Sequence, residues 1–164
     1  MSMSAKDLRK FMIAAAMSKG EIDEFLSVPR IARMASIMDG KPHIVPVWFY
    51  YDGTNIIVST PKDTRKAKNL QNNPNVSIVI DVVEGKSGDL SFLNGKAVII
   101  EGIVEIRDEI DNNSFARKTY ERYVGKAALD SPFVQFSVNM PRYMLVIKPV
   151  KIISWDFNKL PPLE

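Results

Sequence analysis

Two hairpin signals close together in the sequence favour antiparallel β-structure. Asp39-Gly40 separates two apolar runs, and Asp-Gly is a dipeptide typical of two-residue hairpin turns. A second turn-rich segment, residues 52–55, leads into a third apolar run. We therefore predict strands over residues 31–38, 43–51 and 56–60, each antiparallel to the one before it.

Further strands and helices are predicted along the rest of the chain. The strands lie at 76–83, 96–107, 143–148 and 150–155. Four helices are predicted. Two begin at the capping-box patterns of Ser4 and Ser18, and the other two cover residues 64–71 and 111–124. About seven strands that are mostly neighbours in sequence predict a mainly β fold, an antiparallel β-barrel with peripheral helices, rather than a βαβ sheet.

Three segments interrupt this regular pattern. Gly102 lies inside a long strand and predicts a bulge or bend there. Pro149 cannot donate a hydrogen bond to a β-ladder, so it is expected to separate the last two strands. Residues 84–89 contain two glycines and are expected to form an exposed loop or flap.

The length of 164 residues fits a single domain over 1–164, because domains average about 150 residues. We divide it into N-terminal helices (1–28), a barrel with inserted helices (29–157) and a tail (158–164). Apolar residues make up 46% and charged residues 25%, the balance of a soluble globular protein.

Two scarce residue types exclude several kinds of chemistry. The sequence has no cysteine, which excludes disulfides, thiolate metal sites and cysteine nucleophiles. Its single histidine, His43, excludes metal sites that need several imidazoles and is expected to be a surface or packing residue. If the protein is an enzyme, its reactive group is therefore expected to come from a bound cofactor.

Composition also limits the compartment and the partners. No apolar run approaches the roughly 20 residues that span a bilayer, and nothing calls for an oxidising compartment, so we expect a cytoplasmic protein. The formal net charge is only +3, and the aromatic residues lie in an apolar run rather than in a basic groove. We expect neither nucleic acid nor a membrane as a partner.

The segment 62–68 carries an unusual arrangement of charges. If Asp63 or Thr64 caps the helix, Arg65 and Lys66 occupy its first turn, where the helix dipole disfavours cations by about 0.3–1 kcal/mol each. This arrangement suits a bound anion, which the free backbone N–H groups, the Thr64 hydroxyl and both cations could contact. A solvated basic helix face is an equally good interpretation of the charges alone.

The run 44–51 is continuously apolar, which is typical of a strand buried on both faces. Pro46 leaves neighbouring backbone groups without ladder partners, so a flat ring could lie along Val47 and Trp48. A core strand or a dimer interface explains the same run.

Two acidic clusters at predicted helix starts are interpreted as caps rather than metal sites: Glu21, Asp23 and Glu24, and Asp108, Glu109 and Asp111.

Taken in order, several of these segments form a recognisable set. They are Asp39-Gly-Lys-Pro-His, Val45-Pro-Val-Trp-Phe, Asp52-Gly, Ser59-Thr60, Thr64-Arg-Lys-Ala-Lys-Asn-Leu and Asn73-Pro-Asn-Val. Over residues 22–157, and most strongly over 31–82, the chain resembles the pyridoxamine 5′-phosphate oxidase-like family of flavin-binding split β-barrel proteins.

The resemblance implies a six-stranded split β-barrel of the FMN-binding type, forming a homodimer with two FMN molecules at its interface. It implies that the FMN phosphate is bound by Thr64, Arg65 and Lys66, with Ser59 and Thr60 from the preceding strand. It further implies contacts to the flavin ring from the second strand and from a tryptophan of the last strand in either subunit: Val45, Pro46, Val47, Trp48, Phe49 and Trp155.

The implied function is a flavin-dependent oxidoreductase with a small-molecule substrate. The chain departs from true pyridoxamine phosphate oxidases, because Asp-Phe-Asn-Lys follows Trp155 where they carry Arg-Leu-His-Asp, and Val45 stands where they carry arginine. Vitamin B6 oxidation is therefore not expected. Two alternatives remain: a reductase that uses a deazaflavin coenzyme on the same fold, and a flavin-binding protein that is not an enzyme.

Overall fold

The computed structural model describes residues 4–83, 85–88, 90–110 and 113–160. Its β-strands form one antiparallel sheet with the order β2-β1-β5-β6-β7-β4-β3. The strands are β1 (Ala32–Met38), β2 (Lys41–Val47), β3 (Tyr50–Tyr51), β4 (Ile56–Pro61), β5 (Asn75–Val83), β6 (Gly95–Asp108) and β7 (Arg142–Asp156).

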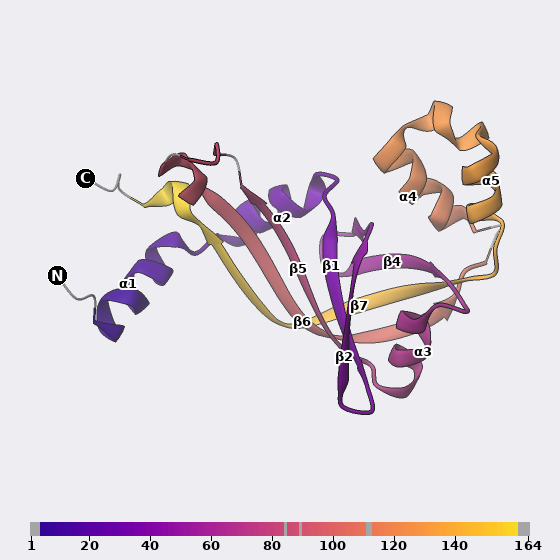
Figure 1. Ribbon diagram of the computed structural model, residues 1–164, viewed down its shortest axis with the longest axis horizontal. Helices are drawn as coiled ribbons and strands as arrows, with labels where there is room; N and C mark the ends of the chain where they lie inside the picture. The colour runs from indigo at the N-terminus through magenta and orange to yellow at the C-terminus, as the bar shows by residue number, and fades with distance from the viewer. Residues whose placement is uncertain (1–3, 84, 89, 111–112, 161–164) are drawn as a thin grey trace.

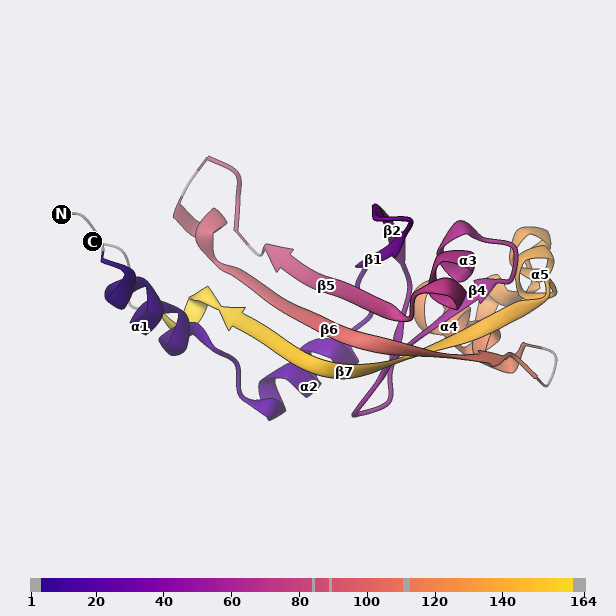
Figure 2. The same ribbon diagram turned by 90° about the horizontal axis from the view of Figure 1, so that it is seen from below.

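Helices lie at both ends of the long strands. Figures 1 and 2 show α1 beside one end of β7 and the pair α4 and α5 at the opposite end. The α-helices are α1 (Ala5–Ala15), α2 (Lys19–Ser27), α3 (Arg65–Asn72), α4 (Ser114–Val124) and α5 (Pro132–Val138). Short 3₁₀ turns are η1 (Leu90–Leu93), η2 (Lys126–Asp130) and η3 (Phe157–Lys159).

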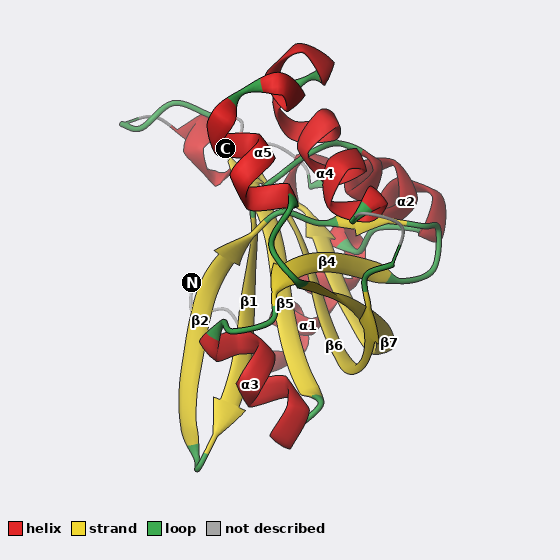
Figure 3. Cartoon of the chain, turned by 90° about the vertical axis from the view of Figure 1, so that its right-hand side faces the viewer, coloured by secondary structure: helices red, strands yellow, loops and turns green. Residues whose placement is uncertain are grey.

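The sheet is strongly curled, as Figure 3 shows along the long axis of the molecule, and it encloses the main apolar core. Alternate strand residues point inward, because successive side chains of a strand lie on opposite faces. Fully buried examples are Met34, Ile78, Ile100, Leu145 and Ile147. β2 and β4 do not pair with each other, so the barrel is open between these two strands. The predicted mainly β fold, a split β-barrel with peripheral helices, is confirmed.

Local sequence signals predicted the turns and helix starts. Asp39 and Gly40 both have positive φ, 52° and 72°, as the two-residue hairpin turn requires. At Ser18 the hydroxyl accepts a hydrogen bond from the backbone of Glu21, and the Glu21 carboxylate accepts one from the backbone of Ser18. Ser4 and Asp7 form the same reciprocal pair at α1, so both capping boxes are confirmed.

The prediction of one strand over 43–51, buried on both faces, is wrong for the isolated chain. β2 ends at Val47, and only residues 50–51 form β3. Ile44 is 66% exposed and Pro46 is exposed, whereas Val47 is buried. The reason is topological: β2 is an edge strand that pairs only with β1, and its outer face has no covering element among the described residues.

The two predicted final strands are one strand, β7, which continues through Pro149. Pro149 lies opposite Gly102, and the register of β6 against β7 shifts at this point. The shift is a β-bulge, which accommodates the missing proline N–H because ladder bonding is already interrupted there. The bulge prediction at Gly102 is thereby confirmed.

Sequence reasoning did not predict η2 and α5. Ser131 caps α5 by accepting a hydrogen bond from the backbone of Val134, with Pro132 in the first turn. Parts of four other predictions lie outside the described residues: positions 1–3 of the N-terminal segment, 84 and 89 of the expected loop, 111–112 of the predicted fourth helix, and 161–164 of the tail. Among the described helices, none has both the length and the apolar character needed to cross a bilayer.

Gly102 is required by close packing of the backbone. A Cβ atom there would lie 2.6 Å from the carbonyl oxygen of Lys148 and 3.0 Å from Cγ2 of Ile147. We predict that Gly102→Ala lowers the free energy of unfolding by about 1–3 kcal/mol, because backbone atoms must move to accept the methyl group. Urea unfolding followed by circular dichroism measures the change.

Gly20 of α2 is the matched control, because a Cβ there meets nothing within 4 Å. Gly20→Ala should leave stability unchanged or raise it by up to about 1 kcal/mol through reduced freedom of the unfolded chain. Equal stability of the two alanine variants would show that the bulge tolerates a side chain.

Candidate functional site

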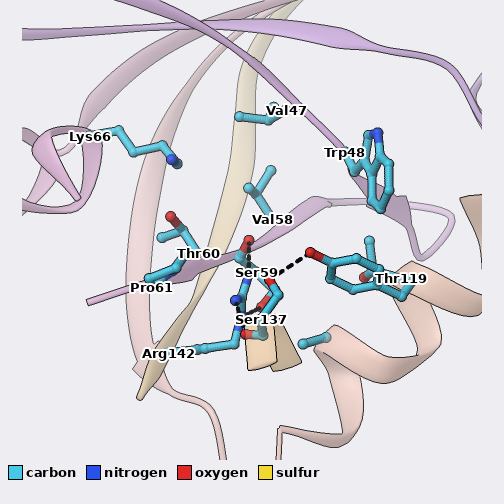
Figure 4. A pocket seen from close by; sticks show the side chains of 12 residues that line it. Val47, Trp48, Val58, Ser59, Thr60, Pro61, Lys66, Thr119, Ser137 and Arg142 are labelled. Atoms are coloured by element: carbon cyan, nitrogen blue, oxygen red, sulfur yellow. Dashed lines mark hydrogen bonds between the residues drawn. The ribbon is translucent and has the colours of Figure 1, made fainter. Parts of the chain in front are cut away.

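A cavity of about 210 Å³ opens at the split between β2 and β4. One side is formed by β4 and the first turn of α3, and the other by the end of β2, α4 and α5 (Figure 4). Its lining residues are Val47, Trp48, Val58, Ser59, Thr60, Pro61, Lys66, Ala116, Thr119, Tyr120, Ser137 and Arg142.

Lys66 is the cation of this cavity that lacks a partner. Its half-buried side chain forms no hydrogen bond or ion pair with any described residue, and Figure 4 shows its ammonium reaching toward Thr60. Burial, and the positive charge of Arg142, lower the pKa of Lys66 from its ordinary value of 10.5. A buried charge without a counter-charge is unfavourable, so this position suits an anion.

The start of α3 adds further positive potential beside Lys66. Thr64 caps the helix by accepting a hydrogen bond from the backbone N–H of Ala67, and its hydroxyl donates to the carbonyl of Pro61 at 3.0 Å. Thr60 lies 3.1 Å from Thr64, oxygen to oxygen. The first turn of α3 holds no acidic residue, so the positive end of the helix dipole is not offset there.

Arg142 forms the floor of the cavity through a buried network. Its guanidinium donates to the hydroxyl and the carbonyl of Ser59 at 2.6 and 3.2 Å, and to the carbonyl of Ser137 at 2.9 Å. The Ser59 hydroxyl donates to Glu109 at 2.6 Å, and Glu109 also accepts from the backbone of Ala116. Burial lowers the pKa of Arg142, an effect that the Glu109 carboxylate opposes.

Aromatic and hydroxyl groups form the opposite wall. The Trp48 indole stacks on Tyr123 with centroids 4.7 Å apart and meets Tyr120 edge-on at 5.1 Å. Tyr123 is fixed by hydrogen bonds to the backbone of Phe49 and Arg30, and burial raises its pKa above 10.0. The Tyr120 hydroxyl lies 2.6 Å from the Ser137 hydroxyl.

The structure brings together part of the predicted site. Five of the predicted residues line the cavity: Val47, Trp48, Ser59, Thr60 and Lys66. The other residues of these segments lie elsewhere. Val45 packs against the core, Phe49 is fully buried, and Pro46 and Arg65 are exposed, while Thr64 caps α3 without lining the cavity.

Trp155 lies at the far end of β7 from this cavity. Leu145 pairs with Val58 of the cavity wall, and Trp155 follows ten residues later, about 30 Å further along the strand. The structure therefore does not bring Trp155 to the cavity of its own chain. The family resemblance allowed this tryptophan to come from either subunit of a dimer. If Trp155 contacts the cofactor in this cavity, it must therefore come from a partner copy.

Sequence reasoning missed the α4–α5 side of the site. It gave no role to these lining residues: Ala116, Thr119, Tyr120, Ser137 and Arg142. Glu109 was interpreted as a helix cap rather than a metal ligand. It accepts a hydrogen bond from the backbone of Ala116 in the first turn of α4, but it lies five residues before the helix, whose N-cap residue is Asn113. No local signal linked Glu109 to Ser59 and Arg142, which are 50 and 33 residues away in the sequence.

Residues 18–156 match the sequence model of a family described as pyridoxamine 5′-phosphate oxidase. Among curated proteins, general stress protein 26 of Bacillus subtilis is 32% identical over 100 residues. This alignment covers 60% of the present chain and 71% of that protein.

Several solved structures share the fold. A conserved hypothetical protein from Mycobacterium tuberculosis is 27% identical with a TM-score of 0.69, over 100% of this chain and 96% of that one. An F420 reductase has 20% identity and a TM-score of 0.63, over 79% and 94%. A FAD-binding protein from Mesorhizobium loti has 20% identity and a TM-score of 0.60, over 85% and 92%.

The Arg142–Glu109 network gives a stability prediction. We expect Arg142→Met to lower the free energy of unfolding by about 3–5 kcal/mol, because it leaves the carboxylate of Glu109, only 2% exposed, without a counter-charge. The double variant with Glu109→Gln should recover part of the loss, since it removes that buried charge. A urea-unfolding double-mutant cycle measures both changes.

Lys148→Met is the control, because Lys148 pairs with Glu105 at 2.6 Å on the surface. We expect it to cost less than about 1 kcal/mol. If Arg142→Met cost no more than this control, the buried network would not hold the cavity floor together.

Proposed function

This chain belongs to the pyridoxamine 5′-phosphate oxidase family, and we propose that it is a flavin-dependent oxidoreductase that binds FMN and acts on a small molecule. The observation that carries this proposal is the half-buried ammonium of Lys66, unpaired among the described residues, beside the start of α3. A bound flavin would supply hydride or electron transfer. The chain itself would supply binding and orientation.

The residues present fit a flavin phosphate. Lys66 would provide the buried charge, and the first-turn N–H groups of α3 would donate to the phosphate oxygens. Exposed Arg65 could reach the same helix end from the surface. Ser59 is not free to donate to the phosphate, because its hydroxyl already donates to Glu109. Its role would instead be to position Arg142, which donates to the Ser59 hydroxyl.

The cavity also fits part of a flavin ring system, because Val47, Val58 and Trp48 give it apolar and aromatic surfaces. One unpaired ammonium at one helix end matches a single phosphate group, which favours FMN over a dinucleotide. The FAD-binding and F420-linked proteins that share this fold support a cofactor of the flavin class.

A deazaflavin coenzyme such as F420 is the second candidate cofactor, since an F420 reductase is among the similar structures. Lys66 suits the phosphate of either cofactor, so it does not distinguish them. Parallel titrations with FMN and F420 distinguish them by affinity. An enzyme and a protein that only binds flavin can be distinguished by a turnover experiment. Only an enzyme should pass electrons from its bound, reduced cofactor to a small-molecule acceptor.

The lack of cysteine agrees with a cytoplasmic location, which we also propose.

We propose a homodimer, based on an apolar row across the outer face of the sheet. Val79 pairs with Ile99, and Ile99 pairs with Ile153, so the three side chains lie side by side on adjacent strands. All three are only partly buried, and Trp155 lies on the same face two residues beyond Ile153. A second copy that covers this row would also lie beside Trp155, which agrees with a role of this tryptophan at the cofactor site of the partner.

Lys66→Gln tests the cofactor proposal. We expect the dissociation constant for FMN to rise roughly tenfold or more, because a charge-assisted contact to phosphate is lost. The affinity for riboflavin, which has no phosphate, should not change. Flavin absorption and fluorescence titrations measure both, and Lys68→Gln, an exposed position on the same helix, is the matched control.

The same titration has a predicted pH dependence. Because the pKa of Lys66 is lowered, its charge is lost as pH rises at a lower pH than for an exposed lysine. FMN affinity should fall in that range for the unmodified protein and stay flat for Lys66→Gln. Colourless protein that takes up neither FMN nor F420 on reconstitution would reject the proposal.

Val79→Lys tests the dimer. A lysine within the apolar row should shift the protein to monomers in sedimentation velocity while circular dichroism stays unchanged. Val124→Lys is the control, because Val124 is 44% exposed at the end of α4 and away from the row. Monomeric unmodified protein at micromolar concentration would contradict the proposed interface.

A further inference from the structure

One wall of the cavity has no role in cofactor binding as proposed above. We call it the α4–α5 wall; it consists of Ala116, Thr119, Tyr120 and Ser137, with Trp48 beside it. In Figure 4, Thr119 and Trp48 lie across the cavity from Lys66. The wall therefore faces the position proposed for the cofactor phosphate without containing it.

The wall offers one hydrogen-bond donor to a ligand. Tyr120 and Ser137 carry two hydroxyl hydrogens, and only one of them lies in the 2.6 Å bond between their oxygens. The described residues provide no acceptor for the second hydrogen. Thr119 is not available in the same way, because its hydroxyl donates to the carbonyl of Phe115 at 3.0 Å.

The rest of the wall is flat and apolar. Ala116 contributes only a methyl group, and the Trp48 indole, which is also proposed to border the flavin ring, packs beside the wall against Tyr120 and Tyr123. No aspartate or glutamate is among the lining residues, whereas Lys66 and Arg142 are both cations. Such surroundings favour a neutral aromatic ring that carries a hydrogen-bond acceptor, and disfavour a cationic ligand.

The donor pair is held by rigid neighbours. Ser137 belongs to α5, whose Val134 and Val138 pack against Ala116 of α4. Arg142 donates to the carbonyl of Ser137, so the network that forms the cavity floor also fixes the serine. A ligand acceptor would therefore meet a donor that is already placed, which reduces the entropy cost of binding.

We propose that the α4–α5 wall is a substrate subsite for a small aromatic carbonyl compound, whose oxygen accepts a hydrogen bond from the Tyr120–Ser137 pair. This inference rests on the proposed function, in which the α3 side of the cavity holds the cofactor phosphate. In this proposal, substrate preference depends on α4 and α5 rather than on the strands of the barrel.

Equilibrium dialysis of FMN-loaded protein against two probes of the same shape tests the subsite. Acetophenone carries the carbonyl acceptor, and α-methylstyrene replaces its oxygen with CH₂. We expect acetophenone to bind about fivefold more tightly, the effect of one neutral hydrogen bond. In the double variant Tyr120→Phe/Ser137→Ala the two probes should bind equally. Tyr50→Phe, an exposed tyrosine outside the cavity, should keep the preference.

Three results would overturn the inference: equal binding of the two probes by the unmodified protein, a preference that persists in the double variant, or displacement of acetophenone from flavin-free protein when FMN is added. The last would mean that the wall belongs to the cofactor site, and it would leave the proposed function standing. If no flavin binds, the proposed function fails by itself. The same two-probe comparison on flavin-free protein then decides the subsite.

Discussion

The contact between Arg142 and Glu109 is the interaction on which the candidate site depends. It joins the start of β7 to the segment after β6, and through Ser59 it reaches β4. Glu109 also accepts a hydrogen bond from the first turn of α4. Two opposite charges buried together are stable only when their remaining hydrogen-bonding groups are satisfied, and this network satisfies them with backbone and hydroxyl partners.

The charge balance of the network explains the role of Lys66. Glu109 offsets Arg142, but the described residues place no carboxylate against Lys66. The cavity thus carries one positive charge in excess, at a position where the α3 dipole adds to it. The electrostatic argument made from the sequence applies to Lys66, whereas Arg65 reaches solvent.

Features that depend on neighbouring residues were predictable from the sequence. The Asp39-Gly40 turn and the Ser18–Glu21 capping box are each formed within four residues, so the sequence contains all of their partners. The exposure of Ile44 was not predictable, because it follows from the edge position of β2 in the sheet. Continuation of β7 through Pro149 likewise depends on Gly102, far away in the sequence.

The site was predictable only where it coincides with a local signal. The α3 segment supplied Lys66 and the capping Thr64, and the preceding strand supplied Ser59 and Thr60. The residues of α4 and α5 reach the cavity through tertiary packing, which a single sequence does not reveal. Ser131 at the start of α5 is a recognisable cap, and it was the one signal that could have drawn attention to this region.

The self-contained packing of α4 and α5 has a functional consequence. Ala116, Val134 and Val138 form a small cluster of their own, separate from the core that the strands enclose. We therefore expect replacements of cavity-side groups such as the Tyr120 hydroxyl to change the cavity more than the main core. Ligand preference and the stability of the main core are thus set largely by different groups of residues.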